Sequence, residues 1–508
     1  MTAKAVQSPQ RRGLTWLLPR LEDVVFVALF LLVVLLGPRL LNVDGDLGRH
    51  LTIGEYIIQT GRIPTTDLFS HTMSGEPLTP HEWLAQVVFA LTYRLLGLDG
   101  IVLLCAILIA LTFARVYRIA ARRSGMRLAS LALALLAASA SSLHWLARPH
   151  LFTLLLVVVW TDGLESIARG ERQAWWRQPL IMLVWANLHG AFIIGFAVWL
   201  AYLAEAAWLT LFPRPSQPKG STAGGLLLAG LLSLGVTFAN PAGPAVWATS
   251  VGYVGNAYLV GHTAEYLSPN FHDVSTWPFL LLIVLALVVI GLGPRRIRPR
   301  SLLVLTGWIA LGLVSVRHIP VAAVLAAPIL AEAAAAALSG TAFVESWLRR
   351  EAGLHALEAR LRGRLWPTAG LLVVAGLFAA GLRVTPFPGG NAFSPRVFPV
   401  EAMDWVDVHP RAGRVFNYFP WGGYLLYRAW PAMTVFIDGQ TDFYGEALTR
   451  EYEQVITLDD AWQRILGKYD VGWVIMPASS RLVRALQATP GWTELYADGT
   501  AVILEREH

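Results

Sequence analysis

The sequence has little cysteine and little charge. Its one cysteine, Cys105, excludes a disulfide within the chain and a metal site built from cysteines. Only 15% of the 508 residues are charged, 55% are hydrophobic, and the mean hydropathy is +0.52. Soluble globular proteins have about 25% charged residues. This composition therefore predicts a protein whose solvent is the lipid bilayer.

Several apolar runs approach the roughly 20 residues that a helix needs to cross the hydrocarbon core. Examples are 24–36, the run around 101–114, and 279–292. A transmembrane barrel would show short alternating segments instead. Basic residues precede the first run, as in a signal peptide, but no small-residue cleavage site follows it. We therefore expect a retained first span.

The net charge of +6 comes from basic residues that gather in short connections. The positive-inside rule places such connections in the cytoplasm, which explains the charge without a nucleic-acid partner. More than half of the 40 Lys and Arg residues lie in the tail 1–22 and in 115–127, 169–177, 214–219, 295–300 and 349–364. The alternating connections are poor in cations, and the longest, 241–273, has none.

This rule predicts eleven spans in the plasma membrane, with the N-terminus in the cytoplasm and the C-terminus outside. The ranges are 23–41, 99–119, 128–146, 151–167, 179–188, 191–212, 223–240, 275–293, 301–317, 320–338 and 367–383. The fifth is too short to cross alone, so the break at His189-Gly190 predicts a re-entrant or broken helix pair. If 81–97 crossed the membrane, the basic connection 115–127 would lie outside, against the positive-inside rule. We therefore expect 81–97 to be a helix on the outer surface.

The fold class we predict is an all-α polytopic membrane domain followed by a C-terminal extracytoplasmic α/β domain. The membrane domain is 23–383, with an unusually long first outer loop at 42–98, and the α/β domain is 384–508. In the latter, apolar runs of strand length alternate with helical stretches. The predicted strands are 414–416, 434–437, 473–476 and 501–504, and the predicted helices are 422–429, 448–455 and 460–467.

In this topology most of the histidines and several other polar residues lie on one side of the membrane. Of the 12 histidines only His355 falls in a cytoplasmic connection. Most of the others, with several Asp, Glu, Asn and Arg residues, fall in outer loops or at outer span ends. Polar groups near lipid are costly unless they face a cavity or a partner, so their convergence predicts a site at the outer face. Anchoring at the membrane interface explains single polar residues, but it predicts that such residues occur equally at both faces of the membrane.

The sharpest motif is Asp44-Gly45-Asp46, directly after the first span. The glycine allows a tight turn, so both carboxylates can point at one proton, metal ion or sugar hydroxyl. A carboxylate in a partly dry pocket can act as a general base. The alternative is an acidic turn that caps the helix beginning near Leu47.

This architecture resembles the GT-C superfamily of membrane glycosyltransferases, which includes protein O-mannosyltransferases, aminoarabinose transferases and oligosaccharyltransferases. The shared features are an acidic motif in a long first outer loop, many spans and an outer C-terminal domain. Five phrases also resemble an uncharacterised bacterial GT-C-like group with no assigned substrate. They are His81-Glu82-Trp83, Arg148-Pro149-His150, Asn187-Leu188-His189-Gly190, Asn240-Pro241-Ala242-Gly243 and Arg317-His318-Ile319-Pro320.

The resemblance implies transfer of a sugar from a polyprenyl-phosphate donor to a glycan, lipid or protein acceptor on the outer face, with inversion. Asp44 and Asp46 would be catalytic, one as the base and the other positioning the acceptor or sharing a metal. Arg148 and Arg317 suit the donor phosphate. The substrate-binding candidates are His50, His81, Glu82, Arg148, His150, Asn187, His189, Glu265, Arg317 and His318.

A divalent cation is the cofactor to consider, because Asp44, Asp46, His50, His81 and Glu82 could converge on one ion. Among the families that the chain resembles, only the oligosaccharyltransferases use one. The spacing differs from a zinc helix motif, and we expect no obligatory metal.

Two further motifs lie in the C-terminal domain. The segment 437–445 follows a predicted strand and either shapes an acceptor pocket or forms an ordinary Asp-Gly turn. The aromatic and glycine-rich segment 417–423 suits packing against the membrane domain or sugar stacking, and packing is the simpler explanation.

Three other functions compete with sugar transfer. A transporter of lipid-linked substrates would place polar residues near the midplane and show inverted repeats, whereas no repeat is visible. A non-catalytic scaffold that binds a partner would not need clustered Asp, His and Arg. An acyl- or phosphate-transferring enzyme of the outer face would use the same base and cations.

Overall fold

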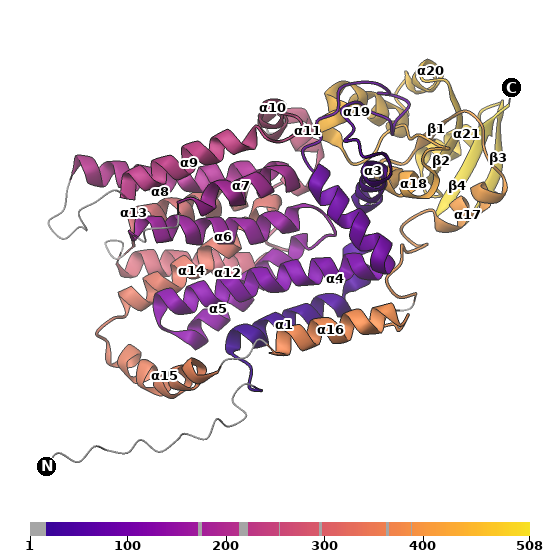
Figure 1. Cartoon of the computed structure of the whole chain (residues 1–508). Coiled ribbons are helices and arrows are strands. Elements are labelled where there is room, and N and C mark those ends of the chain that lie inside the picture. The colour runs from indigo at the N-terminus through magenta and orange to yellow at the C-terminus, as the bar shows by residue number, and fades with distance from the viewer. Residues whose placement is uncertain are drawn as a thin grey trace, which may run out of the picture.

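The structure is a computed structural model that describes residues 17–170, 175–212, 222–252, 255–293, 297–361, 365–387 and 389–507. Some basic segments that the charge rule assigns to the cytoplasm lie outside these ranges: Arg11 and Arg12, the connection 214–219 and the pair 295–296. A bundle of long helices forms most of the molecule, and a smaller part with a β-sheet sits at one end of it (Figure 1). The helix α15 (Ala342–Arg360) lies at the opposite end.

A helix occupies each of the eleven predicted span ranges. The helices of the bundle, besides α15, are α1 (Leu21–Leu35), α2 (Gly37–Asn42), α3 (Asp46–Thr60), α4 (Trp83–Ser124), α5 (Arg127–Ser141), α6 (His150–Ala168), α7 (Arg177–Leu188), α8 (Ile193–Leu211), α9 (Thr222–Thr237), α10 (Ala245–Gly252), α11 (Ala257–His262), α12 (Trp277–Leu292), α13 (Pro299–Val314), α14 (Ile319–Ala337) and α16 (Leu365–Ala379). Six of them, α4, α5, α6, α8, α12 and α14, are long and apolar enough to cross a membrane once short flanking turns are included. The helices α9, α13 and α16 are apolar but shorter. A span count of eleven therefore stays a prediction.

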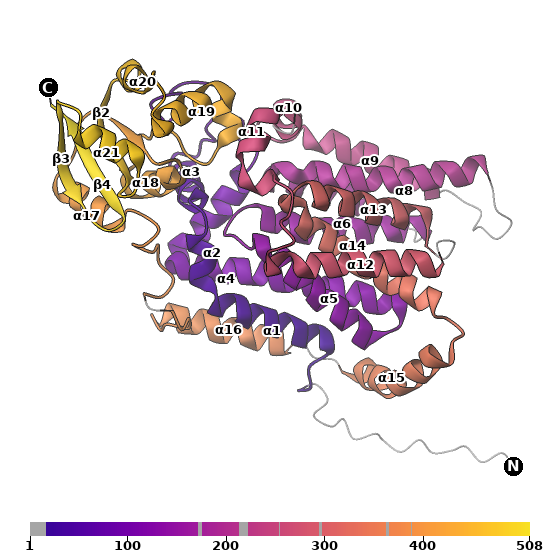
Figure 2. The same cartoon turned by 180° about the vertical axis from the view of Figure 1, so that it is seen from behind.

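The helix α14 forms the centre of the bundle. In α14, 78% of the most apolar stretch is buried, whereas only 28% of the corresponding stretch of α12 is buried. The helix α12 lies at the periphery of the bundle (Figure 2). The sequence of α14 is rich in alanine, and small side chains let neighbouring helices approach closely. The central position of α14 therefore follows from its composition as well as its apolarity.

The helix α4 consists of two pieces. Its backbone leaves helical geometry at Gly97, where φ is 60° and ψ is −146°, a conformation that glycine adopts without strain. The sequence predicts a change from a surface helix to a span at this point. The break is confirmed, whereas the position of the first piece relative to the membrane stays a prediction.

The break predicted at His189 is also present. The helix α7 ends at Leu188, His189 is extended with φ −162° and ψ 136°, and a 3₁₀ turn (Gly190–Phe192) leads into α8. The short helix α7 and the longer helix α8 are therefore separated at the end of the bundle that faces the C-terminal part.

The helix α15 ties α1 and α5 together at the other end. Its Glu351 accepts the backbone N–H groups of Arg127 and Leu128 at 2.7 and 3.0 Å, in the first turn of α5. Its Glu358 accepts the N–H of Leu21 at 2.9 Å, at the start of α1. Carboxylates stabilise helix N-termini, so α15 fixes these two ends.

The C-terminal part is a four-stranded sheet with helices. The strands are β1 (Arg414–Asn417), β2 (Val471–Pro477), β3 (Trp492–Ala497) and β4 (Ala501–Arg506), in the order β1-β2-β4-β3, with β1 and β2 parallel and the other pairs antiparallel. The helices are α17 (Val400–Val408), α18 (Gly422–Ala429), α19 (Thr441–Thr457), α20 (Trp462–Lys468) and α21 (Arg481–Gln487). The central strand β2 is an almost continuous buried apolar run, as a strand covered on both faces requires.

The prediction of a strand at 434–437 is wrong. Val435 forms only an isolated bridge with Ser70, which belongs to the first outer loop of the bundle. Its N–H donates to Phe69 and its carbonyl accepts from His71, both at 3.0 Å. The apolar segment is thus extended as expected, but a loop more than 350 residues away in sequence supplies its partner, which sequence periodicity does not reveal.

Glycines join α3 to α18. A Cβ at Gly48 would overlap the carbonyl oxygen of Gly423, and one at Gly45 would overlap that of Pro420. Two helices approach so closely only where side chains are missing. The packing role predicted for the segment 417–423 is confirmed by this contact.

Replacing Gly48 with alanine is expected to weaken the junction, because backbone atoms of α18 cannot move aside as a flexible side chain would. Overpacking of this kind costs about 1–3 kcal/mol in the free energy of unfolding. Thermal unfolding of the purified protein and proteolysis at the junction measure it. Gly235→Ala in α9 is the matched control, since a Cβ there meets no atom within 4 Å. Equal unfolding temperatures for the two variants would contradict the prediction.

Candidate functional site

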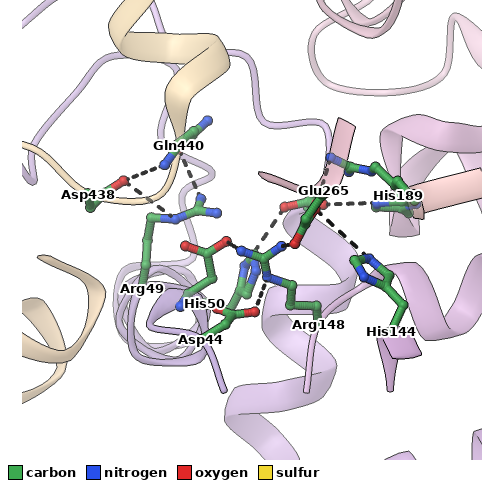
Figure 3. A network of polar contacts seen from close by, with 12 residues as sticks. Asp44, Arg49, His50, His144, Arg148, His189, Glu265, Asp438 and Gln440 are labelled. Carbon is green, nitrogen blue, oxygen red and sulfur yellow. Dashed lines mark hydrogen bonds and ion pairs between the residues drawn. The ribbon is translucent and has the colours of Figure 1, made fainter. Parts of the chain in front are cut away.

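The Asp44-Gly45-Asp46 segment lies where the bundle meets the C-terminal part, between α2 and α3. Gly45 occupies the N-cap of α3 and Asp46 is the first residue of this helix. The backbone N–H of Asp46 donates to Oδ1 of Asp44 at 2.7 Å. This bond closes the tight turn predicted from the sequence, and the other carboxylate oxygens remain free to face Arg148, which precedes α6 (Figure 3).

Arg148 pairs with three carboxylates. Its Nε contacts Asp44, its Nη2 contacts Asp46, and its Nη1 donates to Oε1 of Glu265 at 2.8 Å. None of the four side chains is more than 24% exposed. Burial lowers the pKa of Arg148, but the three carboxylates outweigh it and hold this pKa above its ordinary value. The guanidinium therefore stays charged and orients all three acids.

Asp44 has the titration behaviour of a base. Burial raises the pKa of Asp44 to about 6, because removing a carboxylate from water disfavours its charged form. Arg148 opposes this shift and Asp46 adds to it. At neutral pH the group is mostly deprotonated yet able to accept a proton, which is what general base catalysis requires.

Glu265 links Arg148 to a second arginine. It lies in a 3₁₀ turn (Ala264–Tyr266), with Oε2 3.5 Å from Nη1 of Arg317 and 4.0 Å from Nε2 of His144. Burial raises the pKa of Glu265, but Arg148 and Arg317 shift it below the ordinary value. Arg317 is 34% exposed and also donates to the Tyr266 hydroxyl at 3.1 Å. Of the two arginines, Arg317 is the one more open to an added anion.

Three histidines surround Glu82, the residue before α4. The distances from its carboxylate oxygens are 3.6 Å to Nε2 of His189, 3.8 Å to Nδ1 of His50 and 4.0 Å to Nε2 of His81. Burial lowers the pKa of His50 well below its ordinary value, and Arg49 and Arg148 lower it further. His50 is therefore neutral at pH 7, and its buried Nδ1 has no hydrogen-bond partner among the described residues.

The remaining predicted residues lie around these contacts. Asn187 accepts a hydrogen bond from Nε1 of Trp83 at 2.7 Å, beside Glu82. His150 packs behind His144, with Nε2 2.7 Å from its carbonyl oxygen. His318 is turned elsewhere: its Nδ1 is 3.3 Å from the Leu311 carbonyl and its ring packs on Trp308. The structure thus gathers all the predicted residues except His318.

The C-terminal part contributes residues absent from the predicted site. Asp438 lies 3.8 Å from Nε of Arg49, and Gln440 accepts from Nη1 of Arg49 at 2.9 Å (Figure 3). Burial raises the pKa of Asp438 to about 6, while Arg49 lowers it. A Cβ at Gly439 would overlap Oδ1 of Asp46. The segment 437–445 therefore reaches the acidic motif directly.

A signal for these residues existed in the sequence. Arg49 is one of the few cations in the predicted outer connections, and an acceptor pocket is one of the two interpretations of the segment 437–445. What the sequence lacked was any indication that the two meet. A small hollow with an empty volume of about 260 Å³ lies beside them, and its lining includes Arg49, Ile53, His81, Glu82, Gln86 and Gln440.

The residues do not fit a metal ion as arranged. Within the described ranges, no three His, Cys, Asp or Glu side chains are placed to share one. Asp44, Asp46 and Glu265 converge instead on the Arg148 guanidinium. A cation thus already lies at the point where these three carboxylates meet.

No protein-family model matches the chain, and no curated protein matches it. Several solved structures do match the chain. The apo oligosaccharyltransferase of Archaeoglobus fulgidus superposes with a TM-score of 0.58 at 12% identity, over 92% of this chain and 70% of that chain. The same organism's oligosaccharyltransferase AglB, in complex with an inhibitory peptide and a dolichol-phosphate, gives 0.58 at 13% identity, over 94% and 73%.

ArnT from Cupriavidus metallidurans in the apo state gives a TM-score of 0.50 at 16% identity, over 95% of this chain and 97% of that chain. These similarities confirm the predicted resemblance to GT-C membrane glycosyltransferases at the level of the fold. Together with the apolar helices, they identify the chain as a multi-pass membrane protein.

Proposed function

We propose that this protein transfers a sugar from a polyprenyl-phosphate-linked donor to an acceptor at the end of the bundle that bears the C-terminal part. In this proposal that end is extracytoplasmic, the opposite end is cytoplasmic and the membrane is the plasma membrane. The observation that carries it is the pair Asp44 and Asp46, held by Arg148 between the two parts of the molecule. The similar AglB structure contains a dolichol-phosphate, which supports this class of donor.

The mechanism is a single inverting displacement. Asp44 removes the proton of an acceptor hydroxyl as the acceptor oxygen forms a bond to the anomeric carbon. The bond from that carbon to the phosphate oxygen breaks, and the phosphate leaves with the electron pair. The raised pKa of Asp44 matches this role, since a base works best with a pKa near the working pH.

The leaving phosphate needs a cation near the base. Arg317 suits this role, because its one carboxylate contact is long and it is partly exposed. Arg148 is engaged by three acids and acts as a positioning residue that fixes Asp44 and Asp46. In this proposal the acceptor approaches from the side of the hollow that Arg49, Glu82 and Gln440 line.

The direct test is consumption of defined donors by the purified protein in lipid vesicles. Polyprenyl-phosphate and polyprenyl-diphosphate sugars are supplied with peptide, glycan and lipid acceptors, and release of the lipid carrier is measured. Consumption of a donor with transfer of its sugar supports the proposal. If no donor in a broad panel is consumed or bound, a non-catalytic scaffold or a transporter of lipid-linked substrates becomes the better interpretation.

The transfer rate is expected to fall below a pH of about 6. Asp44 must be deprotonated to accept a proton, and burial raises its pKa to about 6. Lowering the pH through this value protonates the base, so kcat/KM should halve near pH 6 and reach a plateau above pH 7. The Asp438→Asn variant should keep the same profile. A midpoint near pH 4, the ordinary value for an aspartate, would contradict the assignment.

Removal of divalent cations is expected to leave the transfer rate within about twofold, because the Arg148 guanidinium already occupies the point where the three carboxylates meet. Turnover with and without a chelator, after dialysis into metal-free buffer, measures this. A rate that disappears with chelation and returns with Mn²⁺ or Mg²⁺ would show that an ion displaces Arg148 during the reaction.

A further inference from the structure

A second group of charges lies at the end of the bundle remote from the candidate site. Arg300 of α13 donates to Glu165 of α6 through Nε and Nη2, at 3.0 and 2.9 Å, and also pairs with Glu205 of α8. The three side chains are no more than 6% exposed. These buried charges satisfy one another and need no further partner.

Arg123, in the last turn of α4, differs from them. Its side chain is only 4% exposed, yet its nearest carboxylate, Asp162, is 3.7 Å from Nη2. That carboxylate oxygen already accepts a hydrogen bond from Arg122. The Nε of Arg123 is buried and has no hydrogen-bond partner among the described residues. A buried guanidinium with one long ion pair and an unpaired Nε is costly, so Arg123 can take a further anionic partner.

Arg123 lines a hollow with an empty volume of about 370 Å³. The Ser301 side chain lines the same space from the first turn of α13, where unpaired backbone N–H groups favour negative charge. Asp162 and Tyr202 also line it, but Oδ1 of Asp162 accepts from Arg122 and the Tyr202 hydroxyl donates to Glu165. The rest of the lining is largely apolar, from α4, α6, α13 and α14. It includes Val304, Val324 and Ile329.

The composition of this hollow selects its ligand. A guanidinium beside the Ser301 hydroxyl and the first turn of a helix is suited to a phosphate. An apolar wall suits a hydrocarbon chain attached to that phosphate. Pro328, inside α14, has no N–H to donate to the Val324 carbonyl, so this wall also offers a backbone acceptor for a hydroxyl group.

We propose that this hollow binds a single-phosphate lipid, with the phosphate on Arg123 and the apolar chain against α13 and α14. A glycerophospholipid of the leaflet and a polyprenyl phosphate share this chemistry. The proposal does not depend on sugar transfer at the other end of the bundle.

The test uses the delipidated full-length protein and three probes: dioleoylphosphatidylglycerol, undecaprenyl phosphate and inorganic phosphate. Native mass spectrometry and the rise in unfolding temperature report binding. Arg123→Gln is expected to weaken binding of a phosphate lipid by about tenfold or more, because a charge-assisted hydrogen bond is lost. The control Arg122→Gln should change it less than about threefold, since Arg122 is 56% exposed and already bonded to Asp162.

A second variant tests the same hollow in case Arg123→Gln does not fold. Val324→Phe fills the hollow without changing charge and should also weaken lipid binding. Loss of binding for one lipid only identifies that lipid as the ligand. The proposal is overturned if inorganic phosphate alone binds, or if Arg123→Gln and Val324→Phe bind both lipids as the wild type does.

Discussion

Replacing Asp44 with asparagine is expected to lower sugar transfer by about 10²–10⁴-fold, the usual contribution of a general base. Asparagine has the same shape, and its side-chain oxygen can still accept the N–H of Asp46, as Oδ1 of Asp44 does at 2.7 Å. It cannot take up a proton from the acceptor. Single-turnover release of sugar from the lipid carrier isolates this step, because substrate binding and product release are then excluded.

Two comparisons define the result. Asp162→Asn changes a partly buried aspartate at the opposite end of the bundle and should leave turnover within about twofold. Asp46→Asn separates the two acids of the motif. If Asp46→Asn removes activity while Asp44→Asn keeps more than a tenth of it, Asp46 is the base and Asp44 positions it.

Replacing Arg148 with alanine is expected to have the largest effect on stability. The change leaves Asp44, Asp46 and Glu265 together without their shared cation. Removing one partner of a buried ion pair typically costs about 3–5 kcal/mol, because the remaining charges are neither solvated nor paired. The variant should unfold at a clearly lower temperature, and the deficit should shrink at acidic pH, where the carboxylates become protonated.

Arg317→Ala is the matched control. It removes one contact to Glu265 at 3.5 Å from a side chain that is 34% exposed, so its effect on stability should be below about 1 kcal/mol. Added Mn²⁺ should raise the unfolding temperature of Arg148→Ala and not that of the wild type, since three carboxylates without the guanidinium can bind a cation. Equal unfolding temperatures for Arg148→Ala and the wild type would contradict the central role of Arg148.

The site is held together by contacts between segments that are distant in sequence. Arg148 comes before α6, Glu265 from the connection between α11 and α12, and Asp438 from beyond the last helix of the bundle. In Figure 1 the neighbouring elements α3, α11 and α19 lie where the bundle joins the C-terminal part. Exposed ion pairs contribute little, whereas this largely buried set fixes the geometry of two acids at once.

Topological reasoning from the sequence predicted which residues would gather. The positive-inside rule and the one-sided distribution of histidines selected Asp44, Asp46, Glu82, Arg148 and Glu265 before any contact was known. His318 shows the limit of this reasoning: it lies next to Arg317, yet a 3₁₀ turn (Val316–His318) directs its ring toward Trp308 and Leu311. The end of the bundle at which these residues lie was predictable, but side-chain direction was not.

Other failures have the same cause. The segment 434–437 has the apolar pattern of a strand, but it is bonded to the first outer loop and not to the sheet. Arg49 and Asp438 are unremarkable in sequence, and their pairing depends on how α3 and the C-terminal part dock. Local periodicity reports which face of an element is apolar and carries no information about the element that will cover it.

The sequence by itself determined the solvent, the positions of the helices and the end of the bundle where polar chemistry collects. Each of these follows from the cost of placing polar groups in hydrocarbon, which acts on every residue independently. Only the tertiary structure decided that Arg148 occupies the centre of three acids, that Gly48 and Gly439 admit the C-terminal part to the site, and that Nε of the buried Arg123 has no hydrogen-bond partner among the described residues. Those outcomes depend on close packing between distant segments, and packing is a property of the assembled molecule.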